Sequence, residues 1–384
     1  MIGATLYAGV VLQSDIRVPF VDLRTVNLPL REELLEAIGD LLERGSFVAG
    51  RDIEQFEEAF AEFVGTAHCV GLASGLDAVR LALLVSGIEP GDEVIVPANT
   101  FIASIEAVVQ AGGVPVLVDA SLDDYNIDSA LVEAAITPRT RFLVPVHLYG
   151  QLSDMQALRR IAADRDLRIV EDACQAHGAE RDGIRASELS VASAYSFYPA
   201  KNLGAAGDAG ALVTDSEDAA AHARALRQHG EVEKYRSAYP GYTARLDAIQ
   251  AIVLSHKLPH LRGWNAERAA VAAAYTDALA GIEGLGVPPV PADSSPVWHL
   301  YVVRTAKREE LAESLAARGI ATARHYPVPP HLSGAFPELG DGSGSFPVAE
   351  ALADELLSLP IFPGISGEQI ELVCDGIRAF FADA

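Results

Sequence analysis

The chain has 384 residues, 50% of them hydrophobic and 21% charged, a balance typical of a globular protein with a large core. Aspartate and glutamate outnumber lysine and arginine by 53 to 29, which gives a net charge of −24 at pH 7. A field of this sign repels phosphates, so it argues against a general binder of nucleic acid or of anionic membranes. It does not exclude a small anionic substrate, because a few local arginines or helix N-termini can bind one.

The cysteines and the first residues bear on location. The chain has three cysteines at wide spacing without a CxxC pair, namely Cys69, Cys174 and Cys374. This pattern predicts neither a disulfide framework nor a metal site, and it indicates the reducing cytoplasm. The first fifteen residues are mildly apolar and lack a basic start, so we expect residues 1–17 to form an N-terminal leader or an edge strand. No stretch of the sequence reaches transmembrane length.

Two helical patterns open the chain. Residues 30–45, LREELLEAIGDLLERG, place apolar side chains at helical spacing and end at a glycine. The side chains expected on one face are Leu34, Leu35, Ile38, Leu41 and Leu42. Residues 53–65 repeat the pattern with phenylalanines and end at Gly65.

From residue 68 onward, short apolar runs alternate with helical patterns. The strand-like runs cover residues 68–72, 93–97, 114–119, 141–150, 167–172, 191–197 and 210–215. The helical patterns between them cover residues 75–86, 100–111, 128–135 and 153–165. Such alternation predicts an α/β fold with a mostly parallel sheet covered by helices on both faces. In this kind of sheet, ligands bind at the C-terminal ends of the strands.

The pattern changes after about residue 244. A long helical stretch covers residues 246–280 with an interruption near Pro259, and a proline-rich connection follows it. The rest reads as a smaller α+β segment, whose clearest strand is VWHLYVVRT. We therefore predict a large ligand-binding domain over residues 18–255 and a small C-terminal domain over residues 256–384.

Lys201 is the first lysine of the chain and lies in SFYPAKNLG, just after a strand-like run. All the positive side chains before it are arginines. Arginine keeps its proton, whereas a desolvated lysine can lose it and become a nucleophile that forms a Schiff base. The alternative is a solvated surface charge.

Three further sites follow strand-like runs. Asp172 ends one run and fits a strand-end cap, a metal ligand or an acid that holds a ring nitrogen protonated, although no neighbouring residues show metal spacing. Ser74 and Gly75 open a helix, where free backbone N–H groups suit a phosphate. Phe101 follows another run and suits either stacking on a planar cofactor or plain core packing.

The order of these features resembles the fold-type-I enzymes that use pyridoxal phosphate (PLP). In particular, the chain resembles the sugar aminotransferases of the DegT/DnrJ/EryC1/StrS family. The resemblance begins at VPFVDL, covers nearly the whole chain, and is most specific in EDACQAHGA followed by SFYPAKNLG. It implies a large PLP-binding domain with a mostly parallel central sheet and a smaller α+β C-terminal domain.

The resemblance also implies roles for single residues. Lys201 would form the Schiff base with PLP and carry the proton between the two carbons, and Asp172 would pair with the ring nitrogen. Gln175 would lie near the phenolic oxygen, and Phe101 would stack on the ring. The phosphate would be held by Ser74, Ser196 and the backbone of Gly75 and Leu76. The family usually has threonine where this chain has Leu76, so one side-chain contact with the phosphate is expected to be missing.

The resemblance further implies a homodimer with shared active sites. The family usually shows G-x-N-x-R before the helix that starts LDAIQA, and its asparagine reaches the phosphate in the neighbouring subunit. Here the stretch is GYTARLD, so Thr243 takes that place, and its shorter hydroxyl would bind directly, through water or not at all. Arg245 would meet a phosphate of the substrate across the interface; an ordinary ion pair is the alternative.

The segment RHYPVPPH is similar to that of relatives acting on dTDP-3-keto-6-deoxyhexoses. By that resemblance, His325, Tyr326 and Tyr198 would face the hexose; the alternative is a rigid proline-rich loop that packs between domains. The predicted function is transfer of an amino group from an amino acid, L-glutamate, to a nucleotide-linked keto-deoxysugar in amino-sugar biosynthesis. A subset of the family has histidine in place of the lysine and performs dehydration, so Lys201 favours amino transfer.

Other functions remain open from the sequence. The chain could aminate a 4-keto sugar or a keto-cyclitol, or be a non-catalytic PLP-binding regulator that retains Lys201. A nicotinamide-dependent oxidoreductase would share the α/β alternation. It is disfavoured because the first clear strand is not followed by G-x-G-x-x-G.

Overall fold

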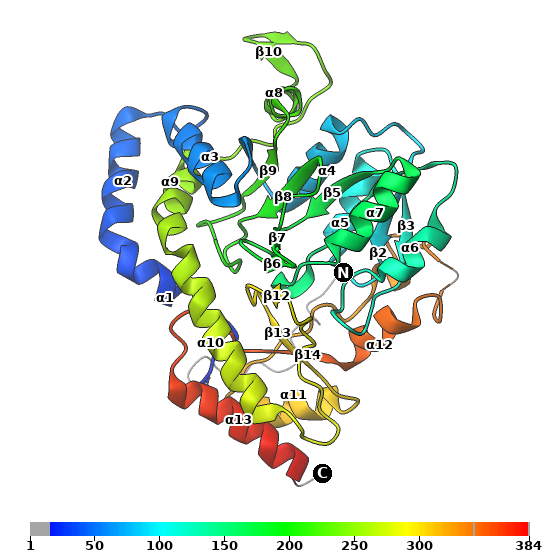
Figure 1. Ribbon diagram of the computed structural model, residues 1–384. Helices are drawn as coiled ribbons and strands as arrows, with labels where there is room; N and C mark the ends of the chain where they lie inside the picture. The colour runs from blue at the N-terminus through cyan, green and yellow to red at the C-terminus, as the bar shows by residue number, and fades with distance from the viewer. Residues whose placement is uncertain (1–15, 341, 383–384) are drawn as a thin grey trace, which may run out of the picture.

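A seven-stranded sheet lies at the centre of the fold (Figure 1). The computed structural model describes residues 16–340 and 342–382, so most of the predicted leader lies outside the described residues. The strand order is β1-β9-β8-β5-β4-β2-β3. The strands are β1 (His68–Leu72), β2 (Glu93–Pro97), β3 (Val114–Val118), β4 (Thr140–Leu143), β5 (Arg168–Asp172), β8 (Ala192–Ser196) and β9 (Gly210–Thr214).

Most of the sheet is parallel, as predicted. β3, β2, β4, β5 and β8 pair in parallel, whereas β9 runs antiparallel to both β8 and β1. The predicted run 141–150 forms a shorter strand, because β4 ends at Leu143 and Pro145 has no N–H for a ladder bond. The chain then forms the short helix η3 (Leu148–Gly150).

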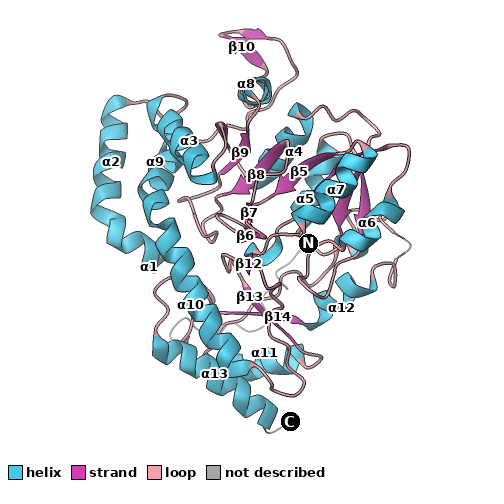
Figure 2. Cartoon of the chain, viewed as in Figure 1, coloured by secondary structure: helices cyan, strands magenta, loops and turns pink. Residues whose placement is uncertain are grey.

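Helices cover both faces of the sheet (Figure 2). One core joins the strands to α3 (Arg51–Val64), α6 (Ser129–Ala135), α7 (Met155–Arg165) and α9 (Ala248–Lys257). The other core joins them to α4 (Gly75–Val85), α5 (Ile102–Gln110) and α8 (Glu217–Leu226). In β5, Ile169 belongs to the first core and Val170 to the second, since successive strand residues point to opposite faces. A strand that is covered on both sides needs apolar residues throughout, which is why these runs are continuously hydrophobic.

The N-terminal helices pack at one side of the molecule. α1 (Arg24–Asn27) and η2 (Leu28–Leu30) lead into α2 (Arg31–Arg44), which ends at Gly45 as predicted. Leu41 is fully buried against Ala248 and Ile252 of α9. The apolar face predicted here is only partly covered, because Leu35 and Leu42 are 52% and 62% exposed. The reason is that α2 lies at the outside of the molecule, with α9 and α3 on one side (Figure 1).

A second body of apolar packing forms the C-terminal part. The predicted helical stretch is α9, then η4 (Leu258–His260) at Pro259, then α10 (Leu261–Leu279). The antiparallel pair β13 (Tyr301–Arg304) and β14 (Leu356–Leu359) packs with α10, α11 (Arg308–Ala317) and α13 (Gly367–Ala382). The remaining elements here are η5 (Pro330–Leu332) and α12 (Pro347–Glu355). Val18 pairs with Ile320, so the start of the described chain joins this part.

The limit predicted between the large and the small domain does not fall between two elements. The limit between residues 255 and 256 lies inside α9, and the division into three parts stays a prediction. Two short sheets were not predicted, because strands of two or three residues leave no periodicity in the sequence. They consist of β6 (Glu180–Arg181), β7 (Ile184–Arg185) and β12 (Ser294–Ser295), and of β10 (Glu231–Glu233) and β11 (Arg236–Ser237). Within the described residues, none of the helices has the length and apolarity needed to cross a membrane.

Candidate active site

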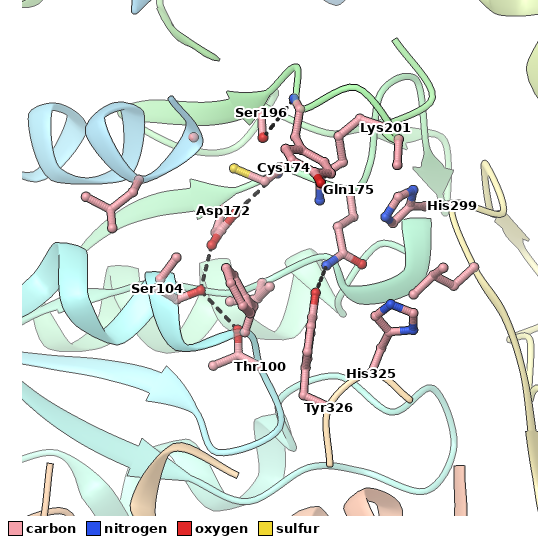
Figure 3. Close-up of a pocket in the computed structure, with 18 of the residues that line it drawn as sticks. Thr100, Ser104, Asp172, Cys174, Gln175, Ser196, Lys201, His299, His325 and Tyr326 are labelled. Atoms are coloured by element: carbon pink, nitrogen blue, oxygen red, sulfur yellow. Dashed lines mark hydrogen bonds between the residues drawn. The ribbon is translucent and has the colours of Figure 1, made fainter. Parts of the chain in front are cut away.

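A cavity of about 560 Å³ lies at the C-terminal ends of the central strands (Figure 3). β5 ends at Asp172 and β8 ends at Ser196, and both side chains line it. The helix α4 begins at the same place, with Gly75. Segments from the C-terminal part close the opposite wall with His299, His325 and Tyr326 (Figure 3). The cavity therefore lies where the parallel sheet predicts a ligand.

The carboxylate of Asp172 is held by two hydrogen bonds. Ser104 donates its hydroxyl proton to Oδ2 at 2.7 Å, and the backbone N–H of Cys174 donates to Oδ1 at 3.2 Å. The oxygen of Ser104 lies 3.0 Å from that of Thr100. Because the single proton of Ser104 goes to Asp172, the hydroxyl of Thr100 donates to Ser104. This chain of bonds orients a charged group that is only 6% exposed.

Lys201 lies on a tight loop after β8. Its backbone N–H donates to the Tyr198 carbonyl at 2.8 Å, and Nζ of Lys257 donates to the Gly204 carbonyl at 2.7 Å. A Cβ at Gly204 would lie 2.2 Å from the Pro199 oxygen, so this turn requires glycine. Burial lowers the pKa of Lys201, and the nearby Cys174 and Asp172 partly offset the effect. The amine therefore loses its proton more readily than a surface lysine would.

The start of α4 offers unused donors. The hydroxyl of Ser74 accepts from the Asp77 N–H at 3.1 Å and so caps the helix. Among the described residues, the N–H groups of Gly75 and Leu76 have no acceptor. A Cβ at Gly75 would lie 2.6 Å from Cβ of Ser196, so glycine is what lets Ser196 approach the helix end. Leu76 lines the cavity and also packs against the core.

Gln175 connects the floor of the cavity to the C-terminal wall. Its Oε1 accepts from the Tyr149 N–H at 2.8 Å, and its Nε2 donates to the hydroxyl of Tyr326 at 3.3 Å. The ring of Tyr326 lies 4.9 Å from that of Phe101, which is 47% exposed. Phe101 therefore borders the cavity as a half-open ring and is not plain core.

His325 and Tyr198 also border the cavity. Nδ1 of His325 lies 2.8 Å from the Ser358 hydroxyl, and its ring stacks on Phe20 at 5.6 Å. Burial, together with the charge of Lys201, lowers the pKa of His325 to about 4. The imidazole is therefore neutral near pH 7. Tyr198 is 55% exposed.

Thr243 and Arg245 do not line this cavity. Thr243 is exposed, and its Oγ1 lies 3.3 Å from Nε2 of His229. The backbone of Arg245 bridges to Leu72. The resemblance expects both residues to act on a neighbouring subunit, so their roles stay predictions.

Among the lining residues that were not predicted from the sequence are the polar side chains of Ser104, Arg268 and His299. Ser104 follows Thr100 by four residues, a spacing that places both on one side of a helix start. Nothing in that spacing indicates Asp172 as the partner. His299 lies in VWHLYVV, whose apolar residues predict only a strand.

Comparison with known proteins assigns the family. Residues 29–378 match the family described as DegT/DnrJ/EryC1/StrS aminotransferases. The chain belongs to this family. The members of this family are PLP-dependent aminotransferases and not nicotinamide-dependent oxidoreductases.

Several relatives of this family member align over nearly their whole length. It is 49% identical to the dTDP-3-amino-3,4,6-trideoxy-alpha-D-glucose transaminase of Streptomyces venezuelae, over 94% of this chain and 96% of the relative. It is 46% identical to the erythromycin biosynthesis sensory transduction protein EryC1 of Saccharopolyspora erythraea, over 94% of this chain and 99% of the relative. It is 41% identical to the dTDP-3-amino-3,6-dideoxy-alpha-D-galactopyranose transaminase of Aneurinibacillus thermoaerophilus, over 94% and 99%.

Solved structures of the family agree with the fold. S. venezuelae DesV in complex with a ketimine intermediate is 49% identical, with a TM-score of 0.93 over 95% of this chain and 99% of that one. NtdA from Bacillus subtilis with bound cofactor PMP is 31% identical, with a TM-score of 0.89 over 95% of this chain and 85% of that one. The predicted fold and cofactor class are confirmed.

Proposed function

We propose that this chain transfers an amino group from L-glutamate to carbon 3 of a dTDP-linked 3-keto-6-deoxyhexose in amino-sugar biosynthesis. The observation that carries the proposal is one cavity that holds Lys201, with its lowered pKa, and the oriented carboxylate of Asp172. The names of two relatives support the sugar, since both describe dTDP-linked sugars with the amino group on carbon 3.

The lining residues fit PLP. The free N–H groups of Gly75 and Leu76 and the hydroxyl of Ser196 suit its phosphate, with the positive end of α4 behind them. The carboxylate of Asp172 suits a protonated ring nitrogen, Phe101 suits the ring face, and Gln175 suits the phenolic oxygen. When bound, PLP would supply an electron sink for the charge left by removal of a proton from the amino-bearing carbon.

The side chains would then divide the work as follows. Nζ of Lys201 would hold the cofactor and, once released, would carry the proton from the α-carbon of the donor to the reacting carbon of the cofactor. A base for this step works best when its pKa lies near the working pH, which the burial of Lys201 favours. Asp172, held by Ser104 and Cys174, keeps its negative charge facing the ring nitrogen.

On the sugar side, we assign His325, Tyr326 and Tyr198 to the hexose. His325 is neutral, and its ring is fixed by Ser358. The imidazole can therefore exchange a hydrogen bond with a hydroxyl of the uncharged hexose ring. Tyr326 is fixed by Gln175, and the exposed Tyr198 borders the opening. Two rigid partners and one adaptable partner would set the orientation of the keto carbon.

We also assign the working form to a homodimer in the cytoplasm. Leu28, Leu35 and Leu42 are 61%, 52% and 62% exposed. Leu35 and Leu42 are seven residues apart and so lie on one side of α2, and Leu28 lies in η2 just before it; a second copy of the chain could cover them. In such a dimer, Thr243 and Arg245 would reach the partner's cavity. The three free cysteines, Cys69, Cys174 and Cys374, fit a reducing compartment.

The decisive experiment offers the holoenzyme L-glutamate and one acceptor at a time, with mass-spectrometric detection of the amino product. The acceptors are a dTDP-3-keto-6-deoxyhexose, the dTDP-4-keto isomer and a keto-cyclitol. We expect turnover of the 3-keto sugar and loss of it in Lys201→Arg, because a guanidinium cannot form the bond to the cofactor. Turnover of only the 4-keto sugar or the cyclitol would contradict the proposed substrate.

The same assay tests the regulatory alternative. L-glutamate alone should abolish the visible absorbance of the bound cofactor within one turnover. A purified holoprotein whose absorbance does not respond to L-glutamate, or to other amino acids, would be a PLP-binding regulator and not a transaminase.

A further inference from the structure

Arg268 of α10 is a buried positive charge without a negative partner among the described residues. The side chain lines the cavity, and the residue is 3% exposed. No aspartate or glutamate oxygen lies within 4.0 Å of it among residues 16–340 and 342–382. Burial lowers the pKa of Arg268 to about 10, so the guanidinium is still charged at pH 7. A buried charge of this kind is costly unless something compensates for it.

The backbone compensates for only one edge of this guanidinium. Nη1 donates to the carbonyls of Trp298, His299 and Ile361 at 3.2, 3.4 and 3.0 Å. Nε is buried and has no acceptor, and Nη2 donates to no residue in the part of the chain that the structure describes. The free Nε–Nη2 edge has the fork geometry that binds both oxygens of a carboxylate.

His299, whose backbone carbonyl accepts from Nη1 of Arg268, also lines the cavity and has a side chain without a hydrogen bond among the described residues. It is 9% exposed and lines the cavity next to Lys201 and His325 (Figure 3). Its Nδ1 has no partner among the described residues. Burial lowers the pKa of His299, and the charges of Lys201 and Arg268 add to the effect. The ring is neutral at pH 7 and can donate one hydrogen bond.

The backbone that carries His299 is held on three sides. The side chain of Asn202 donates to the Val297 carbonyl at 2.7 Å, and the Leu300 N–H donates to the Tyr149 carbonyl at 3.3 Å. Trp298 has a φ of 51°, a left-handed conformation that is costly for a bulky residue and persists only where the surroundings impose it. Arg268 is one of the groups that impose it. The surrounding contacts therefore hold the free ring of His299 in the cavity.

The keto sugar and the amino-acid donor offer different chemical groups to the part of the cavity lined by Arg268 and His299. A hexose offers neutral hydroxyls near the reacting carbon, whereas an amino-acid donor brings a carboxylate one bond from it. The other charged groups that line the cavity are Lys201 and the acids Glu106, Asp172 and Asp208. Arg268 is thus the one permanently charged cation among the described lining residues.

Building on the proposed function, we infer that Arg268 and His299 form the binding site for a carboxylate of the amino-acid donor. The carboxylate would take the free edge of Arg268 as a bidentate partner and accept one hydrogen bond from His299. It would thereby neutralise the buried charge each time that the donor binds. The sugar, which enters the same cavity in the second half of the reaction, would not use this pair.

The test separates the two half-reactions. The holoenzyme is mixed with L-glutamate alone, and the aminated enzyme is mixed with the keto sugar alone, each as a single turnover followed by the visible absorbance. A charge-assisted pair is worth enough that Arg268→Lys, which lacks the fork, should lower the donor kcat/KM about tenfold or more. Arg268→Gln should lower it further. The sugar half-reaction should change by less than about threefold, since it makes no contact with the pair.

A second readout does not depend on catalysis. Glutarate, a dicarboxylate without an amine, should raise the melting temperature of the wild-type holoenzyme and leave that of Arg268→Gln unchanged. The matched control is Arg262→Lys, on the same helix, whose guanidinium lies over the Phe63 ring outside the cavity. It should behave as wild type in both assays. His299→Asn provides a second variant and should weaken the donor half-reaction selectively if Arg268 variants do not fold.

Equal losses in both half-reactions, or unchanged donor kinetics in Arg268→Gln, would overturn the assignment. This test of the donor site can fail or succeed independently of the test of the proposed sugar substrate. A wild-type enzyme that reacts with L-glutamate but not with the 3-keto sugar would refute the sugar, while the Arg268-dependent donor step would still support this site.

Discussion

At the scale of single residues, the site depends on side chains whose partners come from distant parts of the chain. Asp172 is oriented by Ser104, and Gln175 by Tyr149 and Tyr326. A short motif places a functional group at a strand end, but the bonds that orient it arise only in the folded chain. Substitutions at these orienting residues should therefore reduce activity without removing any group that reacts.

Ser104→Ala tests the support of Asp172. The hydroxyl is buried and donates to the carboxylate at 2.7 Å. Because a hydrogen bond to a charged group is worth about 1.5–3 kcal/mol, we expect kcat/KM to fall roughly ten- to a hundredfold. Steady-state kinetics and the pH dependence of the cofactor absorbance would measure it. Thr100→Val, one bond further away, is the control and should have a smaller effect; equal effects would contradict direct support.

His177 predicts how stability depends on pH. Its ring is fully buried beside Phe60, Tyr195 and Phe197, and neither nitrogen makes a hydrogen bond of normal geometry among the described residues. Burial, with the charge of Lys201, lowers the pKa of His177 to about 3. Below its ordinary pKa of about 6.5, the unfolded chain binds a proton that the folded chain does not, so stability falls as the pH drops from about 6.5 towards 3.

Urea unfolding at pH 7 and pH 5 would measure this effect. His177 alone should account for a loss of about 2 kcal/mol between these pH values, and His177→Leu should remove that part of the slope. The exposed His260 offers the control His260→Gln, which should keep the wild-type slope. A His177→Leu protein with the wild-type slope would show that other groups cause the pH dependence.

At the scale of elements, α2 shows how an amphipathic pattern can serve two surfaces. Leu41 is fully buried against residues of α9, whereas Leu35 and Leu42 of the same helix are exposed. The broad leucine face predicted from the sequence therefore exceeds what one chain can cover. The surplus is the physical reason for the proposed dimer.

Leu35→Glu combined with Leu42→Glu should dissociate that dimer. In a two-fold interface each leucine is buried in both copies, and burying a leucine is worth about 1.5–3 kcal/mol. The dissociation constant should therefore rise roughly a hundredfold or more. Sedimentation velocity would measure the change. Glu36→Gln, on the same helix, is the control. A wild-type protein that is monomeric at micromolar concentration would refute the dimer.

At the scale of the whole molecule, the cavity joins the large sheet to the C-terminal part. Asp172, Ser196 and Lys201 come from the sheet side, and His299, His325 and Tyr326 come from beyond α10. A group bound between them touches both parts. Binding of the cofactor should therefore stabilise the whole protein and not a single loop.

Removal of PLP should lower the melting temperature in one cooperative transition. A ligand at a hundred times its dissociation constant stabilises the folded state by about 2.7 kcal/mol, and the gain grows with the logarithm of its concentration. Calorimetry of the stripped protein at increasing PLP would measure the shift. Lys201→Arg, which lacks the covalent bond, should gain less. Equal melting temperatures with and without PLP would contradict binding at this site.

The sequence by itself determined the order of strands and helices along the chain, the positions of Asp172 and Ser196 at strand ends, and the position of Lys201 just after a strand. These follow from local causes: apolar periodicity defines the elements, and a strand end in a parallel sheet is a site by topology. The resemblance to the family rests on the same short-range motifs, whose residues are neighbours along the chain however its elements pack.

Only the tertiary structure decided which side chains meet in the cavity. Ser104, Arg268 and His299 are separated from Asp172 by many residues or by whole elements, and no spacing in the sequence connects them. It also decided that part of the leucine face of α2 is left uncovered. The physical reason is that burial and hydrogen-bond partners depend on how elements pack, whereas periodicity records only that an element has an apolar side.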